Sequence, residues 1–324
     1  MAERKCCFDG AVTMDSAALP LRTEEYRKPY LTRGKRITKA LRKEVPFGIG
    51  SLALVWQFLF FYVPLIFMLF SSISRITISG TFEGFTFAHF AQVMKFDYFN
   101  VIFQSLKLAF STALLTLCLG FPLAYTIALK GGRFKNFLLF LVIIPFWTNF
   151  LLHIYAWFFV LEKGGFLNQM LLYFNIVDAP IHFLNTPFAV YLMMVYYYLP
   201  FMTLPIYSSL EKFDPSLIEA SMDLGATKFQ TFRRVVLPVL MPAIRNGFFL
   251  VFIPSFGEFV IPELMGGDKF TYVGSVVSQF ILGEKTAPIG IAFTVVAGIF
   301  LMGASYLLYR GTFVVTKWLV GGSK

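Results

Sequence analysis

Six long apolar runs constrain this chain more than any other feature of its sequence. They lie at about residues 47–70, 106–129, 137–161, 186–210, 247–264 and 289–309. Each is near the ~20 residues that a helix needs to cross a bilayer. Because backbone groups in lipid must be bonded within the segment, we expect an all-α, polytopic membrane protein with six transmembrane helices. The fifth run is short and contains Pro254, Gly257 and Pro262, so it is the least regular.

The composition supports this assignment to the membrane. Charged residues make up only 14% of the 324 residues, whereas a soluble domain carries about 25%. The net charge of +10 is compatible with nucleic acid, but many basic residues lie in the N-terminal region and beside apolar runs, where membrane topology places them. We therefore expect membrane lipid, and no nucleic acid, as a partner.

The sequence shows no pattern typical of catalysis, a metal site or a bound cofactor. Its three cysteines give no even disulfide framework, and its three histidines lack metal-ligand spacing. A membrane-embedded enzyme would need polar catalytic residues converging at one depth, and we find no such cluster. The chain also lacks the phosphate-binding loop of nucleotide-hydrolysing enzymes. The energy for any transport must then come from a partner or from an ion gradient.

Basic residues set the orientation expected for the six helices. The first 46 residues form a tail with the basic cluster RGKRITKALRK, and residues 47–324 form the membrane domain. Further basic residues collect between the second and third helices, between the fourth and fifth, and at the C-terminus. Because short cytoplasmic loops carry an excess of Lys and Arg, we expect both termini and the connection at about residues 211–242 to face the cytoplasm.

The connection at residues 211–242 begins with the pattern of a short, well-capped helix. Asp214 before Pro215 is typical of an N-cap followed by the first helical residue. Gly225 allows the left-handed conformation that ends a helix. Between them an apolar stripe of small residues recurs at helical spacing, with Glu219 and Asp223 off the stripe. The stripe consists of Leu217, Ala220, Ser221 and Leu224.

A second short helix is expected immediately afterwards. Thr227 and Gln230 match a capping box, in which two side chains satisfy the first free backbone donors of a helix. Pro238 and Pro242 are expected to limit how far this helix runs. The local chemistry therefore predicts a helix, a tight turn and a second helix.

The segment EASMDLGATKFQTFRRVVLP, residues 219–238, resembles the cytoplasmic EAA loop of ABC importer permeases. The match consists of Glu219, Ala220, Gly225, Leu237 and Pro238, with Ser221 in place of the second alanine and Val235 in place of an isoleucine. The resemblance implies a coupling element that docks into an ATPase, with Asp223 on the same helix. From the local pattern alone, a solvated helix–turn–helix is the alternative.

Three further stretches are similar to permeases of spermidine/putrescine importers. They are residues 143–161, 199–214 and 257–267, the last reading GEFVIPELMGG in a form closer to the putrescine-type member. The resemblance covers the chain from about residue 47 onward and implies the MetI-like permease fold in a bacterial inner membrane. It also implies a second permease subunit, two cytoplasmic ATPase subunits, and a periplasmic or lipid-anchored binding protein. Residues 71–105 would then form an outward connection with a short surface helix, available to the binding protein or covering the bundle.

Two carboxylates in the fifth run are the first candidates for the substrate pathway. Glu258 and Glu263 lie within or at the end of an apolar span, and ionisable groups at membrane depth are costly and usually functional. Pro254, Gly257 and Pro262 would open the backbone there, which is tolerated only beside a cavity or other protein. The alternatives are that Glu263 is interfacial and that Glu258 pairs with a neighbour such as a tyrosine hydroxyl.

Aromatic side chains are the second way to hold an ammonium group. Tyr196, Tyr197 and Tyr198 lie mid-span in the fourth run. Because successive helical residues point about 100° apart, they cannot all face one pathway. We take Tyr197 as a candidate, and Trp147 as a weaker one whose alternative is packing or anchoring at the membrane interface.

The sequence thus predicts the permease subunit of an ATP-driven polyamine importer, without enzymatic activity of its own. A permease for another small solute is the nearest alternative, because the EAA loop is shared across substrates. A stand-alone secondary carrier is the other, and it would need no ATPase partner.

Overall fold

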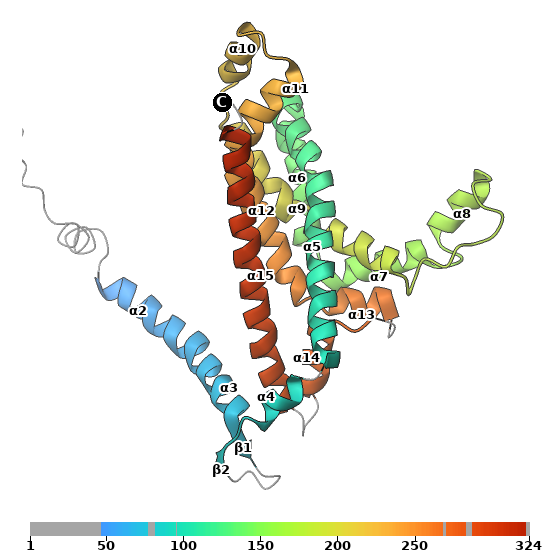
Figure 1. Ribbon diagram of the computed structural model, residues 1–324. Helices are drawn as coiled ribbons and strands as arrows, with labels where there is room; N and C mark the ends of the chain where they lie inside the picture. The colour runs from blue at the N-terminus through green and yellow to red at the C-terminus, as the bar shows by residue number, and fades with distance from the viewer. Residues whose placement is uncertain (1–46, 77–81, 95, 268–269, 283–286, 322–324) are drawn as a thin grey trace, which may run out of the picture. The chain divides into compact units, whose positions relative to one another are not determined.

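The computed structural model describes residues 47–76, 82–94, 96–267, 270–282 and 287–321 (Figure 1). The predicted cytoplasmic tail at residues 1–46 lies outside the described residues. The chain divides into two compact units, Met1–Pro64 and Leu65–Lys324. Within the described residues, six segments are long and apolar enough to cross a membrane, which is the number predicted. They are Gly50–Ile73, Asp97–Lys130, Phe150–Tyr173, Pro187–Glu211, Lys228–Phe256 and Ala287–Val314.

The first span is helical but contains one wider turn. It consists of α2 (Phe47–Gln57), the π-helical segment η1 (Phe58–Tyr62) and α3 (Val63–Ile73). The Val63 N–H donates to the Phe58 carbonyl, five residues earlier. Pro64 follows directly and has no N–H to donate. The wider turn therefore carries the helix past a residue that cannot complete an α-helical ladder.

A small hairpin and a short helix connect the first and second spans. Strands β1 (Ser74–Ile76) and β2 (Phe82–Phe85) pair antiparallel, with Ser74 opposite Phe85. The short helix expected in this connection is α4 (Ala88–Val93), whereas the hairpin was not predicted. It is a local departure from an otherwise helical chain.

Three long helices form the centre of the second unit (Figure 1). They are α5 (Phe96–Tyr125), which continues as the π-helical η2 (Thr126–Lys130), α9 (Pro187–Glu211) and α12 (Leu237–Phe256). Glycines bring α5 and α12 close to α9: a Cβ on Gly120 would lie 3.1 Å from the Met202 Cγ, and one on Gly247 would lie 3.1 Å from the Met202 carbonyl oxygen. Small residues at such crossings let backbones approach closely.

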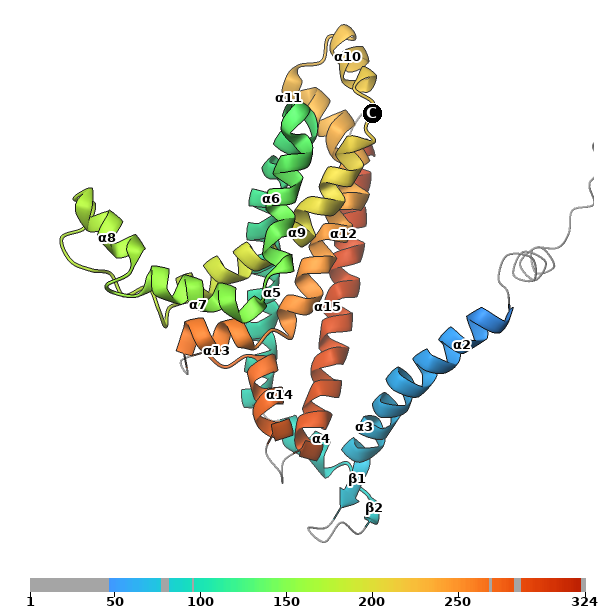
Figure 2. The ribbon, with the colours of Figure 1, turned by 180° about the vertical axis from the view of Figure 1, so that it is seen from behind.

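The third predicted span, residues 137–161, was wrong as a single helix. The structure has α6 (Lys135–Trp147) and α7 (Phe150–Leu161), followed by α8 (Phe166–Tyr173). The break falls at Asn149, whose side chain accepts a hydrogen bond from the Leu151 N–H at 2.8 Å and caps α7. Figure 2 shows α7 and α8 running away from the long axis that α6 follows.

The fifth predicted span, residues 247–264, was wrong at both ends. Helix α11 (Lys228–Thr231) continues through the π-helical η4 (Phe232–Val236) into α12, so that Pro238 and Pro242 do not end it. The reason repeats that of the first span: the Leu237 N–H donates to the Phe232 carbonyl five residues back, directly before Pro238. At the other end the helix stops at Phe256.

The chain beyond α12 returns through two short helices to the last span. These are α13 (Val260–Gly266) and α14 (Val273–Leu282), and the last span lies within α15 (Ala287–Gly321). In both views the end of α15 lies at the same end of the bundle as α10 (Ser216–Asp223), and α14 lies at the opposite end (Figures 1 and 2). The C-terminal end of α15 and the 211–242 connection therefore share one side.

Candidate functional site

The first helix of the 211–242 connection begins one residue later than predicted, at Ser216 with Pro215 at the N-cap. The Asp214 carboxylate accepts a hydrogen bond from the Ser216 N–H at 3.0 Å, at the start of α10. This bond favours the charged form and lowers the pKa of Asp214 below its usual range. The carboxylate also lies where the positive end of the helix dipole stabilises it.

The turn between α10 and α11 is held by backbone and side-chain bonds within the connection. Gly225 has φ +83°, the left-handed conformation predicted for it. Its N–H donates to the Met222 carbonyl at 2.9 Å and the Ala226 N–H donates to the Ser221 carbonyl at 3.2 Å, the pair of bonds of a Schellman motif. The capping box of Thr227 and Gln230 is complete, which confirms that prediction.

Apolar side chains of this connection point into open space. Leu224 is 90% exposed, and Leu217, Met222 and Phe229 are exposed as well. Glu219, Ala220 and Asp223 are also exposed, whereas Ser221 is half-buried and its hydroxyl lies 3.0 Å from that of Thr231. Exposed apolar residues gathered on one turn are typical of a surface that contacts another protein or a membrane.

A break in the membrane-spanning helix positions Glu258. Residues 257–259 separate the end of α12 from the start of α13. One Glu258 carboxylate oxygen accepts from the Val260 N–H at 3.1 Å, and the other accepts from the Tyr198 hydroxyl at 3.2 Å. Tyr198 is buried in α9 and Glu258 is half-buried. The carboxylate is fixed in orientation by two donors but keeps lone pairs for a further donor.

Helix α14 supports the break through one glycine that sequence reasoning missed. A Cβ on Gly274 would lie 2.4 Å from the Gly257 carbonyl oxygen and 3.0 Å from the Glu258 carbonyl carbon. Any larger residue would therefore push α14 away from the unwound segment. Nothing in the local sequence around Gly274 signals this, because the contact joins two separate elements.

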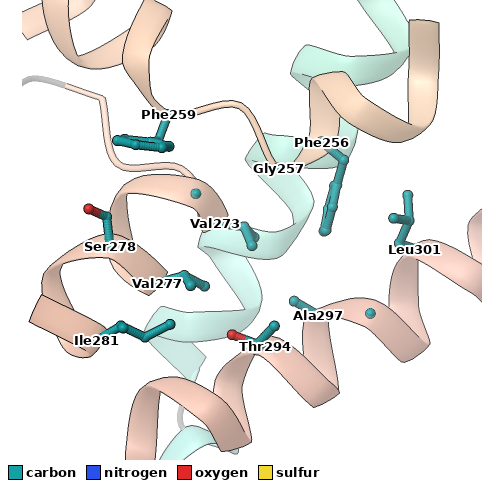
Figure 3. A pocket seen from close by; sticks show the side chains of 12 residues that line it. Phe256, Gly257, Phe259, Val273, Val277, Ser278, Ile281, Thr294, Ala297 and Leu301 are labelled. Carbon is teal, nitrogen blue, oxygen red and sulfur yellow. The ribbon is translucent and has the colours of Figure 1, made fainter. Parts of the chain in front are cut away.

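An apolar cavity of about 580 Å³ adjoins the break (Figure 3). Phe256, Gly257 and Phe259 line it from the break, and residues of α14 and α15 line its other side. The lining is apolar apart from two hydroxyls, and that of Thr294 donates to the Gly290 carbonyl in its own helix at 2.8 Å. The cavity suits methylene groups, and an ammonium group would find no counter-charge on its walls.

The second carboxylate, Glu263, lies in different surroundings. It is exposed on α13 and lines a polar pocket of about 190 Å³ together with Thr271, Ser275 and Gln279. The two predicted carboxylates therefore occupy separate environments, one held by a tyrosine and one open to a polar pocket.

The three tyrosines of α9 reach three different partners, as their helical spacing predicts. Tyr196 lies 2.9 Å from the His153 Nδ1, and Tyr198 bonds to Glu258. Tyr197 stacks with Phe146 and meets Phe150 edge to face, with ring centroids 5.9 and 4.7 Å apart. The tyrosine at the carboxylate is thus Tyr198, one residue after the candidate Tyr197.

Trp147 and His153 lie at the break between α6 and α7. Trp147 is 75% exposed and its ring contacts Phe140, so the structure does not bring it to Glu258. His153 bonds to the hydroxyls of Thr148 and Tyr196. Sequence reasoning passed over this histidine, although a histidine inside an apolar run was a usable signal.

Comparison with known proteins decides the class. Residues 117–315 match the family described as the binding-protein-dependent transport system inner membrane component. The chain belongs to this family. It is therefore a multi-pass inner membrane permease, and the ATPase activity of such systems lies in separate subunits.

Individual relatives and a solved structure agree with the family. The spermidine/putrescine transport system permease protein PotB of Escherichia coli (strain K12) is 39% identical over 255 residues, which cover 78% of this chain and 92% of that protein. PotB of Haemophilus influenzae is 36% identical and covers 82% of this chain and 94% of its own length. A chain from a bacterial ABC transporter that imports the acidic polysaccharide alginate matches with a TM-score of 0.58 at 17% identity, covering 87% of this chain and 98% of its own. That structural likeness shows the permease fold.

Proposed function

We propose that this permease belongs to a polyamine importer of the spermidine/putrescine type, and that Glu258 binds an ammonium group of the substrate during passage. Support for the substrate class comes from relatives at 36–39% identity that are named for spermidine and putrescine. Support for the role of Glu258 comes from its position at the break between α12 and α13. The choice between putrescine and spermidine stays a prediction.

The position of Glu258 carries the proposal. An ammonium group that leaves water loses its hydration and needs a counter-charge or hydrogen-bond acceptors in exchange. A half-buried carboxylate at an unwound segment of a spanning helix supplies both. The Tyr198 and Tyr197 rings lie 5.2 Å apart beside it, and aromatic faces attract cations. The apolar cavity at the break suits the methylene chain between two amines.

The connection at residues 211–242 is proposed as the docking element for the cytoplasmic ATPase. Its exposed apolar residues and self-contained turn support this role. Glu219, Ala220, Ser221, Asp223 and Gly225 would lie in the contact, and Leu237 and Pro238 would join it to the membrane helix. A second permease subunit and a periplasmic or lipid-anchored binding protein complete the proposed system, in which residues 47–324 form the membrane domain and both termini face the cytoplasm.

Uptake by a Glu258→Gln variant tests the proposal. We expect spermidine and putrescine uptake by the reconstituted transporter to need about tenfold to a hundredfold more substrate for half-maximal rate, because a hydrogen bond to a charged group contributes about 1.5–3 kcal/mol. Glu162→Gln, an exposed carboxylate after α7, is the matched control. Unchanged uptake in Glu258→Gln would remove this residue from the pathway, and uptake without an ATPase would favour a secondary carrier.

A further inference from the structure

A groove on the outside of the bundle carries one ammonium group on otherwise apolar walls. It lies between α5, α12 and α15, is open to the outside and has a volume of about 410 Å³. Its lining consists of Phe103, Leu106, Lys107, Phe110, Phe252, Ala304, Leu307 and Leu308. Lys107 is exposed, and among the residues that the structure describes no acidic side chain forms an ion pair with it. An exposed cation at the edge of an apolar groove can bind an anionic partner from outside the chain.

The position of Lys107 along α5 places its charge at a membrane surface. The uncharged residues 108–129 separate it from Lys130 on one continuous helix. At about 1.5 Å per residue the two lysines are about 35 Å apart, close to the ~30 Å of a hydrocarbon core. If Lys130 marks one surface, Lys107 lies near the other, at about the depth of the helix break, because the Ser105 hydroxyl accepts from the Val273 N–H at 2.8 Å and Gly274 packs on the Gly257 carbonyl. The flexible stem of Lys107 lets its ammonium reach the headgroups.

The groove below Lys107 suits a hydrocarbon chain. Phe103, Phe110 and Leu307 present exposed apolar surface to it, and Phe252 forms its floor from α12. The shape therefore matches an amphiphile with one negative end at the membrane surface and an apolar chain directed into the membrane. A polyamine would be repelled by Lys107, and the groove shares no lining residue with the cavity at the Glu258 break.

We propose that this groove binds an anionic phospholipid, with the phosphate on Lys107 and an acyl chain against α5, α12 and α15. Charge complementarity selects an acidic lipid over a zwitterionic one, because basic residues near a membrane surface attract anionic headgroups. In the proposed orientation Lys130 lies on the cytoplasmic side, so the lipid at Lys107 comes from the outer leaflet of the inner membrane. The site does not depend on the identity of the transported substrate.

Native mass spectrometry of the assembled transporter tests this site. The complex is released from nanodiscs that contain phosphatidylglycerol and phosphatidylethanolamine in equal amounts, and the retained lipids are counted. We expect Lys107→Gln to lower the ratio of retained phosphatidylglycerol to phosphatidylethanolamine about fivefold, the effect of one basic residue near a membrane surface. Lys107→Arg should keep the ratio, and so should Lys163→Gln, an exposed lysine after α7.

A second variant changes the shape of the groove and leaves Lys107 in place. Ala304→Phe fills the groove and should lower lipid retention while Lys107 remains. Equal retention in the wild type, Lys107→Gln and Ala304→Phe overturns the proposal. So does efficient crosslinking of a Leu307→Cys variant to the second permease subunit or to the first helix of this chain, because a protein segment would then occupy the groove.

Discussion

The 211–242 connection and the break at Glu258 are both interruptions in helices, but they are held in different ways. In the connection, each bond that defines the turn joins residues at most ten apart, such as Ser221 and Thr231. At the break, the Tyr198 hydroxyl reaches Glu258 across 60 residues, and Gly274 supports it from another helix. The connection can therefore keep its shape while it moves as a unit, whereas the break changes when the packing around it changes.

The largest expected effect is at the break, in a Gly274→Val variant. The new side chain would overlap the Gly257 carbonyl. Overpacking typically destabilises a fold by 1–3 kcal/mol, and because the overlap here is with backbone, we expect the free energy of unfolding to fall by about 3 kcal/mol. Uptake should be lost and the melting temperature of the purified complex should fall. Gly303→Ala, where a Cβ meets nothing within 4 Å, is the control. Normal uptake in Gly274→Val would mean that the break tolerates displacement of α14.

A Tyr198→Phe variant should have the next largest effect. It removes one donor to the Glu258 carboxylate and keeps the ring. Substrate binding should weaken by about 2 kcal/mol, the usual contribution of a hydrogen bond to a charged group. Substrate-stimulated ATPase activity should then need more substrate for half-maximal stimulation, with basal activity unchanged. Tyr196→Phe is the matched control, because its hydroxyl contacts His153 instead. Equal responses in the two variants would contradict a special role for Tyr198.

A Gly225→Val variant tests the connection in the same assay. A Cβ has free space there, so the effect comes from the backbone, where a left-handed residue with a side chain costs roughly 1–2 kcal/mol. We expect the protein to reach the membrane and substrate-stimulated ATPase activity to fall. Gly225→Asn should retain most activity, because asparagine tolerates this conformation. Normal stimulation in Gly225→Val would refute the coupling role.

The smallest effect is expected for Thr227→Ala. Loss of the N-cap should cost about 1 kcal/mol, confined to α11 and its turn. Hydrogen exchange of the amides at residues 227–231 should speed up about fivefold, while uptake changes little. Faster exchange that extends to the Glu258 break would show that the two regions unfold together, which would contradict their being held independently.

The same distinction explains what the sequence could predict. Caps, the left-handed glycine and apolar length are local, so the connection and the existence of six spans were predicted. The break at Asn149 and the passage of α12 beyond Pro238 were missed, because apolar run length does not reveal a cap or a π-helical turn. Glu258 stood out as a charge in an apolar run, and the tyrosine hydroxyl considered as its partner is that of Tyr198. The sequence does not distinguish the three adjacent tyrosines, and only the packing of the helices shows that Tyr198 contacts Glu258.

The helix from Lys228 to Phe256 has a mechanical consequence. It is continuous through η4, and at about 1.5 Å per residue it is roughly 40 Å long. One end carries the turn with the exposed apolar residues, and the other ends directly before Glu258. The two regions are thus opposite ends of one continuous helix, so a rotation of α11 about the helix axis would be carried to Phe256. The π-helical turn at residues 232–236 lies between the two ends, so the bond from the Leu237 N–H to the Phe232 carbonyl would have to hold for the rotation to reach the carboxylate.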